Sequence, residues 1–313
     1  MLREVLLQLA ERSDVRDFIV THRATRDLAR RFVAGETLDD ALHATRSLSA
    51  KGVRAILNHL GERVASLEEA RRAAEDYRRL IERLHAEGLE AHVAVKLTQL
   101  GLDHGVDACA HHLEAVVAAA AEVGSFVAID MENSRYTQAT LDLFETVCRR
   151  HPTHVGVCVQ AYLHRTARDV ERLLRLGARV RLCKGAYLEP PAVALQRKED
   201  VDEQFRRLMA LLIERGACPA IATHDERLIA EAKLLARAFK RSADSFEFQM
   251  LYGVRRDLQD RLVREGYTVR VYVPFGIAWY PYLMRRLAER PANVLFLLRN
   301  VLREERNGAD SGR

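Results

Sequence analysis

The chain has 313 residues, of which 48% are hydrophobic and 30% charged, as in globular proteins with a sizeable core. Its 49 basic and 44 acidic residues give a net charge of +5, and they are interspersed without a basic stripe, which argues against nucleic-acid binding. The five cysteines are odd in number and none are spaced Cys-x-x-Cys. This argues for a reducing compartment and against a disulfide framework or a thiolate metal site.

Residues 1–48 predict a helical arm of short amphipathic helices, with Gly35 and Gly52 as stops. The charges within the first 14 residues argue against a signal peptide, and no later stretch is apolar enough to span a membrane. The arm is therefore expected to pack on the rest of the chain, to pair with another subunit, or to touch lipid.

From there the pattern becomes a regular alternation of apolar, strand-like runs and amphipathic helical stretches. The runs cover 54–61, 89–98, 125–132, 154–162, 178–185, 219–224, 244–251 and 267–276. Eight such units predict a (β/α)8 barrel over residues 49–304. A doubly wound sheet is less consistent, because the sequence has no G-x-G-x-x-G or Walker motif. The polar tail, 305–313, is predicted to be disordered.

In a barrel of this kind, active-site residues lie at the carboxyl ends of the strands. Polar residues occur near these ends in nearly every unit, namely Asn58, Glu62, Lys96, Thr98, Asp130, Glu132, Asn133, Gln160, Tyr162, Arg181, Lys184, Tyr187, Thr223, His224, Asp225, Gln249, Arg270 and Tyr272. Each alone could be structural, as Asp225 could cap the next helix. Together, with lysines and an aspartate next to apolar runs, they favour a functional rim. The isolated histidines lie away from these ends, so no metal site is expected.

Two enzyme classes remain open on the residues alone. The first is a Schiff-base lyase of the class I aldolase type, with Lys96 or Lys184 as the amine nucleophile. The second is a flavin-type redox enzyme, with Lys184 and the helix-terminal N–H groups near Thr223 and His224 holding phosphates. A non-catalytic binding scaffold is less consistent with so many polar strand ends.

The stretch "YPYLMRRLAER", residues 280–290, places Arg285 and Arg286 one turn after Tyr282. Adjacent arginines on a helix are usually a solvated face. Two guanidinium groups can also hold one carboxylate. Helical spacing puts Tyr282, Arg285, Arg286 and Glu289 on one stripe.

Several segments resemble the proline dehydrogenase family. They are "VKLTQLG" (95–101), "IDMENS" (129–134), "VQAYL" (159–163), "VRLCKGAY" (180–187), "IATHD" (221–225), "FEFQMLYG" (246–253), "VYVPFG" (271–276) and "WYPYLMRRLAERPANV" (279–294). They occur in order through the whole barrel. The chain length is similar to that of the stand-alone bacterial enzymes and leaves no room for the aldehyde dehydrogenase module of the bifunctional fusions.

The resemblance implies an FAD-dependent enzyme that oxidises L-proline to 1-pyrroline-5-carboxylate, the first step of proline catabolism to glutamate. Hydride would pass to flavin N5 and the electrons to a membrane quinone. The implied location is cytoplasmic, with peripheral association on the inner face of the membrane. A separate pyrroline-5-carboxylate dehydrogenase is an implied partner, and an oligomer is compatible with the resemblance. The choice of FAD over FMN rests on the resemblance alone.

The resemblance also implies roles for individual residues. Lys96, Arg285 and Arg286 would bind the proline carboxylate, Asp130 would position these cations, and Arg181 would contact the flavin near N5. Pocket residues would be Tyr272, Tyr282, Leu182 and Tyr187, and FAD would be held by Met131, Gln160, Arg181, Lys184, Gly185, Ala186, Thr223, His224 and Glu289. Strand alternation sends Arg181 and Lys184 to opposite faces, so the chain is expected to leave strand geometry before Gly185. The segment 188–198, "LEPPAVALQRK", departs from the acidic stretch of relatives.

Overall fold

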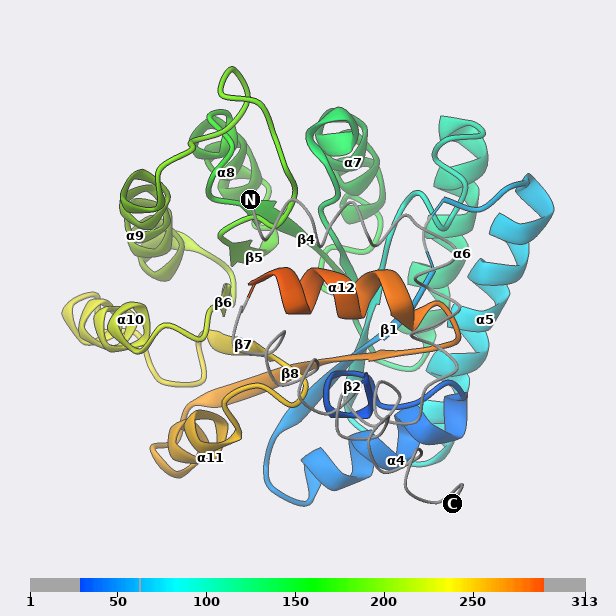
Figure 1. Cartoon of the computed structure of the whole chain (residues 1–313), viewed down its shortest axis with the longest axis horizontal. Coiled ribbons are helices and arrows are strands. Elements are labelled where there is room, and N and C mark those ends of the chain that lie inside the picture. The colour runs from blue at the N-terminus through cyan, green and yellow to red at the C-terminus, as the bar shows by residue number, and fades with distance from the viewer. Residues whose placement is uncertain (1–28, 62, 290–313) are drawn as a thin grey trace, which may run out of the picture.

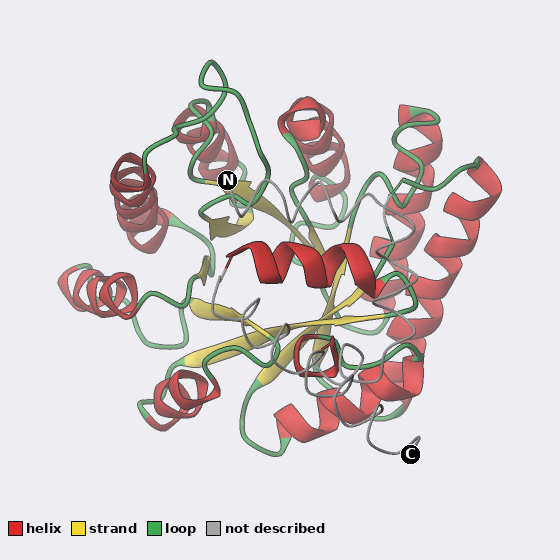
Figure 2. Cartoon of the chain, in the orientation of Figure 1, coloured by secondary structure: helices red, strands yellow, loops and turns green. Residues whose placement is uncertain are grey.

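A computed structural model describes residues 29–61 and 63–289, with side chains up to residue 284. Its eight parallel strands pair in chain order and close into a barrel, which confirms the predicted (β/α)8 fold (Figures 1 and 2). The strands are β1 (Arg54–His59), β2 (Ala91–Val95), β3 (Val127–Ile129), β4 (Val155–Gln160), β5 (Arg179–Cys183), β6 (Ala220–Ala222), β7 (Glu247–Leu251) and β8 (Thr268–Phe275).

The helices between the strands form the outer ring of the barrel (Figure 2). They are α5 (Leu67–Ala86), α6 (Val106–Glu122), α7 (Ser134–Cys148), α8 (Thr166–Arg175), α9 (Lys198–Arg215), α10 (Glu226–Ala238) and α11 (Arg256–Arg264). Helix α12 (Trp279–Glu289) instead lies across the mouth of the barrel (Figure 1). Side-chain caps fix some starting points, since Ser66 accepts from the backbone of Glu69 and Asp225 from that of Arg227.

The strands are shorter than the apolar runs of the sequence. Strand β2 ends at Val95 and β3 at Ile129, so the polar residues that follow lie in the connecting segments. Thr98 shows the reason, because its backbone N and Oγ1 donate to the Glu132 carboxylate at 3.1 and 2.7 Å. Such contacts between the ends of neighbouring strands replace the sheet ladder.

Helix α4 (Leu38–Ser49) begins at a capping box between Thr37 and Asp40. Its inner face, which includes Leu42, belongs to the same core as the barrel strands. The segment before it is tied to the end of β8 by the bond from Gly276 N to Gly35 O, 2.9 Å. Residues 1–28 of the predicted arm and the predicted disordered tail, 305–313, lie outside the described residues.

Two parts of the core lie on the two faces of the barrel wall, as expected for parallel strands that are buried on both faces. The larger part lies between the strands and the outer helices. The smaller part lies inside the barrel and joins Ile56, Ala94, Phe126 and Ala128, with Tyr272 packed against it. Alternate residues of each strand therefore face the helices or the barrel interior.

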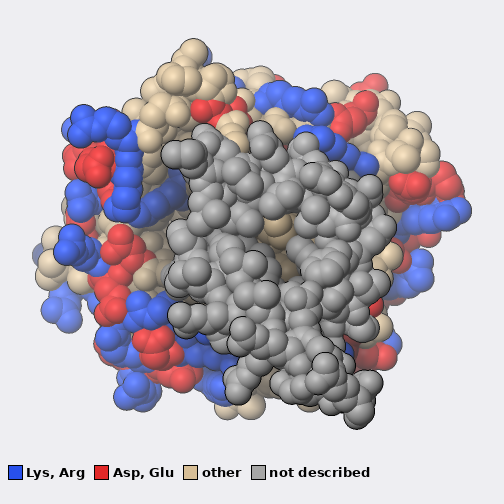
Figure 3. All heavy atoms as spheres, viewed as in Figure 1, with Lys and Arg blue, Asp and Glu red and all other residues tan. Residues whose placement is uncertain are grey.

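Basic and acidic side chains are interspersed over the outer helices on the face shown in Figure 3. Many form ion pairs one helical turn apart, such as Arg72 with Glu68. Exposed pairs of this kind contribute about 0–1 kcal/mol each, so they add little to the stability of the fold.

Candidate active site

A cavity of about 630 Å³ opens at the carboxyl ends of the strands, where barrel active sites lie. Ten of the predicted site residues line it, namely Lys96, Asp130, Met131, Arg181, Lys184, Tyr187, Thr223, His224, Tyr272 and Tyr282. They come from five strand ends and from α12, so residues far apart in the chain meet at one place.

Asp130 is the centre of the polar network in this cavity. It is 8% exposed, and its two carboxylate oxygens have different partners. Oδ1 accepts from Nη1 of Arg181, and Oδ2 accepts from the hydroxyl of Tyr272 at 2.6 Å. Lys96, 7% exposed, lines the same cavity at the end of β2. The network thus fixes one aspartate, one arginine and one tyrosine from three strands.

Arg181 has more donors than partners. Only Nη1 has a partner among the described residues, whereas Nε and Nη2 are buried without one. Burial lowers the pKa of this guanidinium, but the charge of Asp130 opposes that effect. The net result is a raised pKa, so Arg181 stays cationic. Its guanidinium carbon lies 5.6 Å from the ring centroid of Tyr272. The arrangement presents two donor nitrogens that a ligand can satisfy.

The chain leaves regular strand geometry before Gly185, as the sequence predicts. Strand β5 ends at Cys183, and both Arg181 and Lys184 line the cavity. Gly185 has φ +116°, and a Cβ on it would lie 2.2 Å from the ring of Tyr162. Because neither the backbone angle nor the space suits a side chain, glycine is required at this exit.

Lys184 and the neighbouring loops form an ion-pair cluster. Its Nζ contacts Oδ1 of Asp202 and lies 3.7 Å from Oδ2 of Asp225. Lys198 binds the other oxygen of Asp202. Two lysines and two carboxylates therefore lie along one side of the cavity.

The end of β6 contributes a short polar segment. His224 Nε2 accepts from the backbone N of Leu251 at 2.9 Å, so in the neutral ring Nδ1 carries the proton. Oγ1 of Thr223 accepts from the backbone N of Asp225 at 3.1 Å. Asp225 is the helix cap that the sequence suggested and also faces Lys184.

Four other predicted residues do not line the cavity. Leu182 is fully buried in the core between strands and helices, because Arg181 next to it faces the barrel interior and strand neighbours alternate. The prediction of Leu182 as a pocket residue is wrong. Gln160 joins β4 to β3 by donating to Glu132 O at 2.9 Å. Gly185 and Ala186 form the exit from β5, beside the cavity.

Some predicted residues lie outside the described part of the chain. They are Glu62 and the side chains of Arg285, Arg286 and Glu289. The backbone of the latter three belongs to α12, and Tyr282 one turn earlier is 6% exposed and lines the cavity.

Arg270 does not belong to the functional rim. It is the third residue of β8 and pairs in register with Arg54 at the start of β1, near the opposite mouth of the barrel. Its Nε donates to both oxygens of Glu247 at 3.0 Å, and its Nη1 donates to Ala55 O at 3.1 Å. The prediction that Arg270 lies at a carboxyl strand end is wrong.

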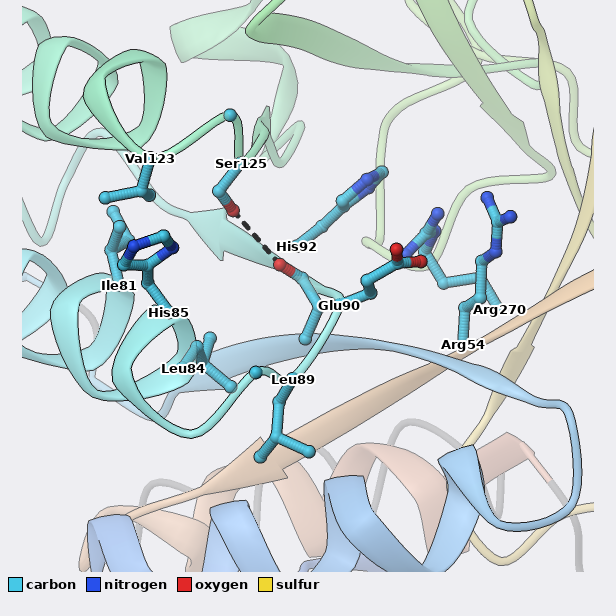
Figure 4. Close-up of a pocket in the computed structure, with 13 residues that line it drawn as sticks. Arg54, Ile81, Leu84, His85, Leu89, Glu90, His92, Val123, Ser125 and Arg270 are labelled. Atoms are coloured by element: carbon cyan, nitrogen blue, oxygen red, sulfur yellow. Dashed lines mark hydrogen bonds between the residues drawn. The ribbon is translucent and has the colours of Figure 1, made fainter.

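This opposite, amino-terminal mouth has a cavity of about 440 Å³ (Figure 4). Its polar lining includes Arg54, Glu90, His92 and Arg270. Burial, followed by the charges of nearby arginines, holds the pKa of His92 well below its usual range. These charged residues are expected to serve the fold, since barrel active sites lie at the other mouth.

The sequence did not single out Cys158, Cys183, Lys198 or Asp202 as site residues, although all lie at the cavity or its ion pairs. Lys198 and Asp202 had a signal in their i, i+4 spacing. The cysteines had none, because an apolar strand accepts cysteine as a small hydrophobic residue. Across residues 29–61 and 63–289, no helix is long and apolar enough to cross a membrane.

Comparison with known proteins identifies the family. The model of the family "Proline dehydrogenase" matches residues 41–299. Proline dehydrogenase 1 of Bacillus subtilis is 39% identical over 304 residues, which cover 97% of this chain and 100% of the relative. Proline dehydrogenase of Deinococcus radiodurans is 39% identical over 307 residues, covering 97% of this chain and 98% of the relative.

The solved structures agree. Proline utilization A (PutA) of Bdellovibrio bacteriovorus, inactivated by N-propargylglycine, superposes with a TM-score of 0.79 at 26% identity. The match covers 84% of this chain and 32% of that one, so this chain spans about a third of that longer protein. The resemblance read from the sequence motifs is confirmed. The chain belongs to the proline dehydrogenase family and is an oxidoreductase of proline catabolism, in a family that depends on flavin.

Proposed function

We propose that this protein uses FAD to oxidise L-proline to 1-pyrroline-5-carboxylate and passes the electrons to a membrane quinone. The observation that carries the proposal is Arg181, a buried cation whose Nε and Nη2 have no partner among the described residues. A buried donor without a partner costs about 1–3 kcal/mol. Such a cost is expected where a ligand completes the hydrogen bonds.

A flavin fits the residues that are present. Its ring offers electron-rich nitrogen and oxygen acceptors to the N–H groups of Arg181, and Thr223, His224 and Lys184 line the side of the cavity where its phosphate-bearing tail would be held. When bound, a flavin would supply the two-electron acceptor for the hydride that proline loses. The choice of FAD over FMN remains part of the proposal.

The protein's main contribution to catalysis would be to position proline. Lys96 would bind the substrate carboxylate together with Arg285 and Arg286. Tyr282 lines the cavity, and α12 is helical through Glu289, so positions 285 and 286 lie on its stripe at i, i+3 and i, i+4. Asp130 offsets part of the positive charge that these groups gather around one carboxylate.

Tyr272 would form the wall against the proline ring. Burial and then the charge of Asp130 hold its pKa well above the usual value, so its hydroxyl stays protonated and donates to Asp130. A neutral phenol held next to Arg181 would limit the space for substituents on the proline ring.

The proposed clamp has a direct test. Arg285→Met and Arg286→Met should each raise the Michaelis constant for L-proline steeply, because bidentate carboxylate contacts are lost. Flavin absorbance per protein should stay at the wild-type level. Unchanged proline saturation in both variants means that the two arginines form only a helix face.

The Schiff-base alternative gains no support from Lys184. That ammonium pairs with Asp202 and Asp225, and a nitrogen held in two ion pairs is not free to attack a carbonyl carbon. Borohydride trapping of a substrate adduct on Lys96 or Lys184 would support the lyase instead.

The experiment that tests the proposed function is an anaerobic absorbance spectrum of the purified protein before and after L-proline. We expect flavin bands that proline bleaches and that a quinone analogue restores. A colourless protein, or a flavin that proline does not bleach, would contradict the proposal.

A further inference from the structure

Two cysteine thiols face each other in the wall of the cavity. Cys158 lies in β4 and Cys183 is the last residue of β5, and their Sγ atoms are 3.6 Å apart. In the strand register Cys158 is opposite Arg181, and Cys183 follows Arg181 by two residues. The two side chains therefore share the interior face of neighbouring strands, and both line the cavity.

We propose that Cys158 and Cys183 form a redox modification site, at which a peroxide converts the two thiols into a reversible disulfide in the cavity wall. The chemistry needs only the thiol pair and the oxidant, and so it stands apart from the proposed proline chemistry.

The reaction balances in two steps. The sulfur of Cys158, as thiolate, attacks one oxygen of hydrogen peroxide, breaks the O–O bond and gives a sulfenic acid and one water. The sulfur of Cys183 then attacks the sulfenic sulfur, forms the S–S bond and releases a second water. Two thiols lose two electrons and two protons in total, and one peroxide is reduced to two waters.

The surroundings favour Cys158 as the first thiol to react. A hydrogen bond from Cys183, followed by the charge of Arg181, lowers the pKa of Cys158 despite its burial. Burial raises the pKa of Cys109 to about 12 and also raises that of Cys148. Because the thiolate is the reactive form, the pair at the cavity should react before these two buried thiols.

Closing the bond needs a small movement of the sulfurs. A disulfide has S–S of about 2.05 Å, so from 3.6 Å the sulfurs have to approach by roughly 1.5 Å. Rotation about the Cα–Cβ bonds moves the sulfurs, and the strand ends have to adjust where rotation alone is too small. A thiol-disulfide exchange with a small dithiol reaches the bond through the cavity and reverses it.

The test starts with the purified full-length protein and graded hydrogen peroxide. Remaining thiols are alkylated under denaturing conditions, and the protein is digested without reductant and mapped by mass spectrometry. We expect a peptide that joins Cys158 to Cys183, the loss of two titratable thiols of the five, and recovery of both after dithiothreitol.

Matched variants assign the chemistry. Cys183→Ser should stop at a Cys158 sulfenic acid that dimedone traps, and Cys148→Ser should cross-link as the wild type does. Five thiols that persist after peroxide, a disulfide that involves Cys109, Cys148 or Cys218, or oxidation of Cys158 beyond sulfenic acid without a cross-link would each overturn the proposal. If a serine variant does not fold, the wild-type peptide map decides alone.

Discussion

Two arginine–carboxylate pairs lie inside the barrel, one near each mouth, and they differ in how completely they are bonded. At the amino-terminal mouth, Arg270 binds both oxygens of Glu247 and a backbone carbonyl. At the carboxyl-terminal mouth, Arg181 binds Asp130 through Nη1 and leaves two buried nitrogens without a partner among the described residues. Among the described residues, the same pair of residue types therefore leaves no buried side-chain nitrogen unbonded at one mouth and two at the other.

The difference follows from what each pair must do. A buried ion pair is stable only if its hydrogen bonds are satisfied, and no buried side-chain atom of Arg270 or Glu247, 2% and 3% exposed, lacks a partner among the described residues. Both arginines line a cavity, but of the two only Arg181 has buried nitrogens without a partner among the described residues. In the proposed function these donors would bind the flavin, which is the preorganisation that catalysis uses.

The largest expected effect comes from breaking the complete pair. Arg270→Leu should lower the free energy of unfolding by about 3–5 kcal/mol, because Glu247 remains buried without its cation. The double variant Arg270→Leu/Glu247→Leu should recover most of the loss. Urea unfolding measures both, and Arg54→Leu, at an exposed position of the same mouth, should change stability by no more than about 0.5 kcal/mol. A single variant as stable as the wild type would show that this pair does not support the fold.

A smaller effect is expected at the exit from β5, where the active-site mouth uses an unusual backbone. Gly185→Ala should lower the free energy of unfolding by about 1–3 kcal/mol, since the added methyl meets Tyr162 and φ is +116°. Gly177→Ala is the control, because φ is +64° and no atom lies within 4 Å of its Cβ. Equal losses in the two variants would mean that contact with Tyr162 has no part in the cost.

The smallest effect concerns pH and the amino-terminal mouth. Folding lowers the pKa of His92, so the unfolded chain binds a proton that the folded chain refuses. The stability from this group is full above pH 6.5, the ordinary value, and declines as the pH falls toward the folded pKa. His92→Gln should flatten the fall by up to about 1.4 kcal/mol per pH unit, as measured by urea unfolding between pH 7 and pH 5. If the free energy of unfolding falls as steeply with pH in the variant as in the wild type, His92 does not cause the loss.

The alternation of apolar runs and helical stretches was enough to predict the order and number of the strands. It could not give their ends, because those depend on contacts such as Thr98 with Glu132, which are distant in sequence. Arg270 was misplaced for a different reason, since it is the fourth residue of the run 267–276 and its position already indicated the amino-terminal mouth.

The sequence could place single site residues that directly follow a predicted strand. It could not show which of these side chains touch each other across neighbouring strands. Asp130 and Lys96 could be placed from their positions, whereas the bond between Asp130 and Arg181 and the approach of Cys158 to Cys183 depend on the register of neighbouring strands. Leu182 is instructive, because simple alternation from Arg181 places it outward. The family resemblance had suggested the pocket instead.

The most direct test of the contrast between the two pairs is the anaerobic rate at which L-proline reduces the bound flavin in Arg181→Lys. This change keeps a cation beside Asp130 and removes the donors that have no partner in the described part of the chain. We predict that the rate falls by about 10²-fold or more with flavin still bound, while Arg270→Lys, if folded, stays close to the wild type. A wild-type rate in Arg181→Lys would contradict the claim that these donors meet the reacting ligand.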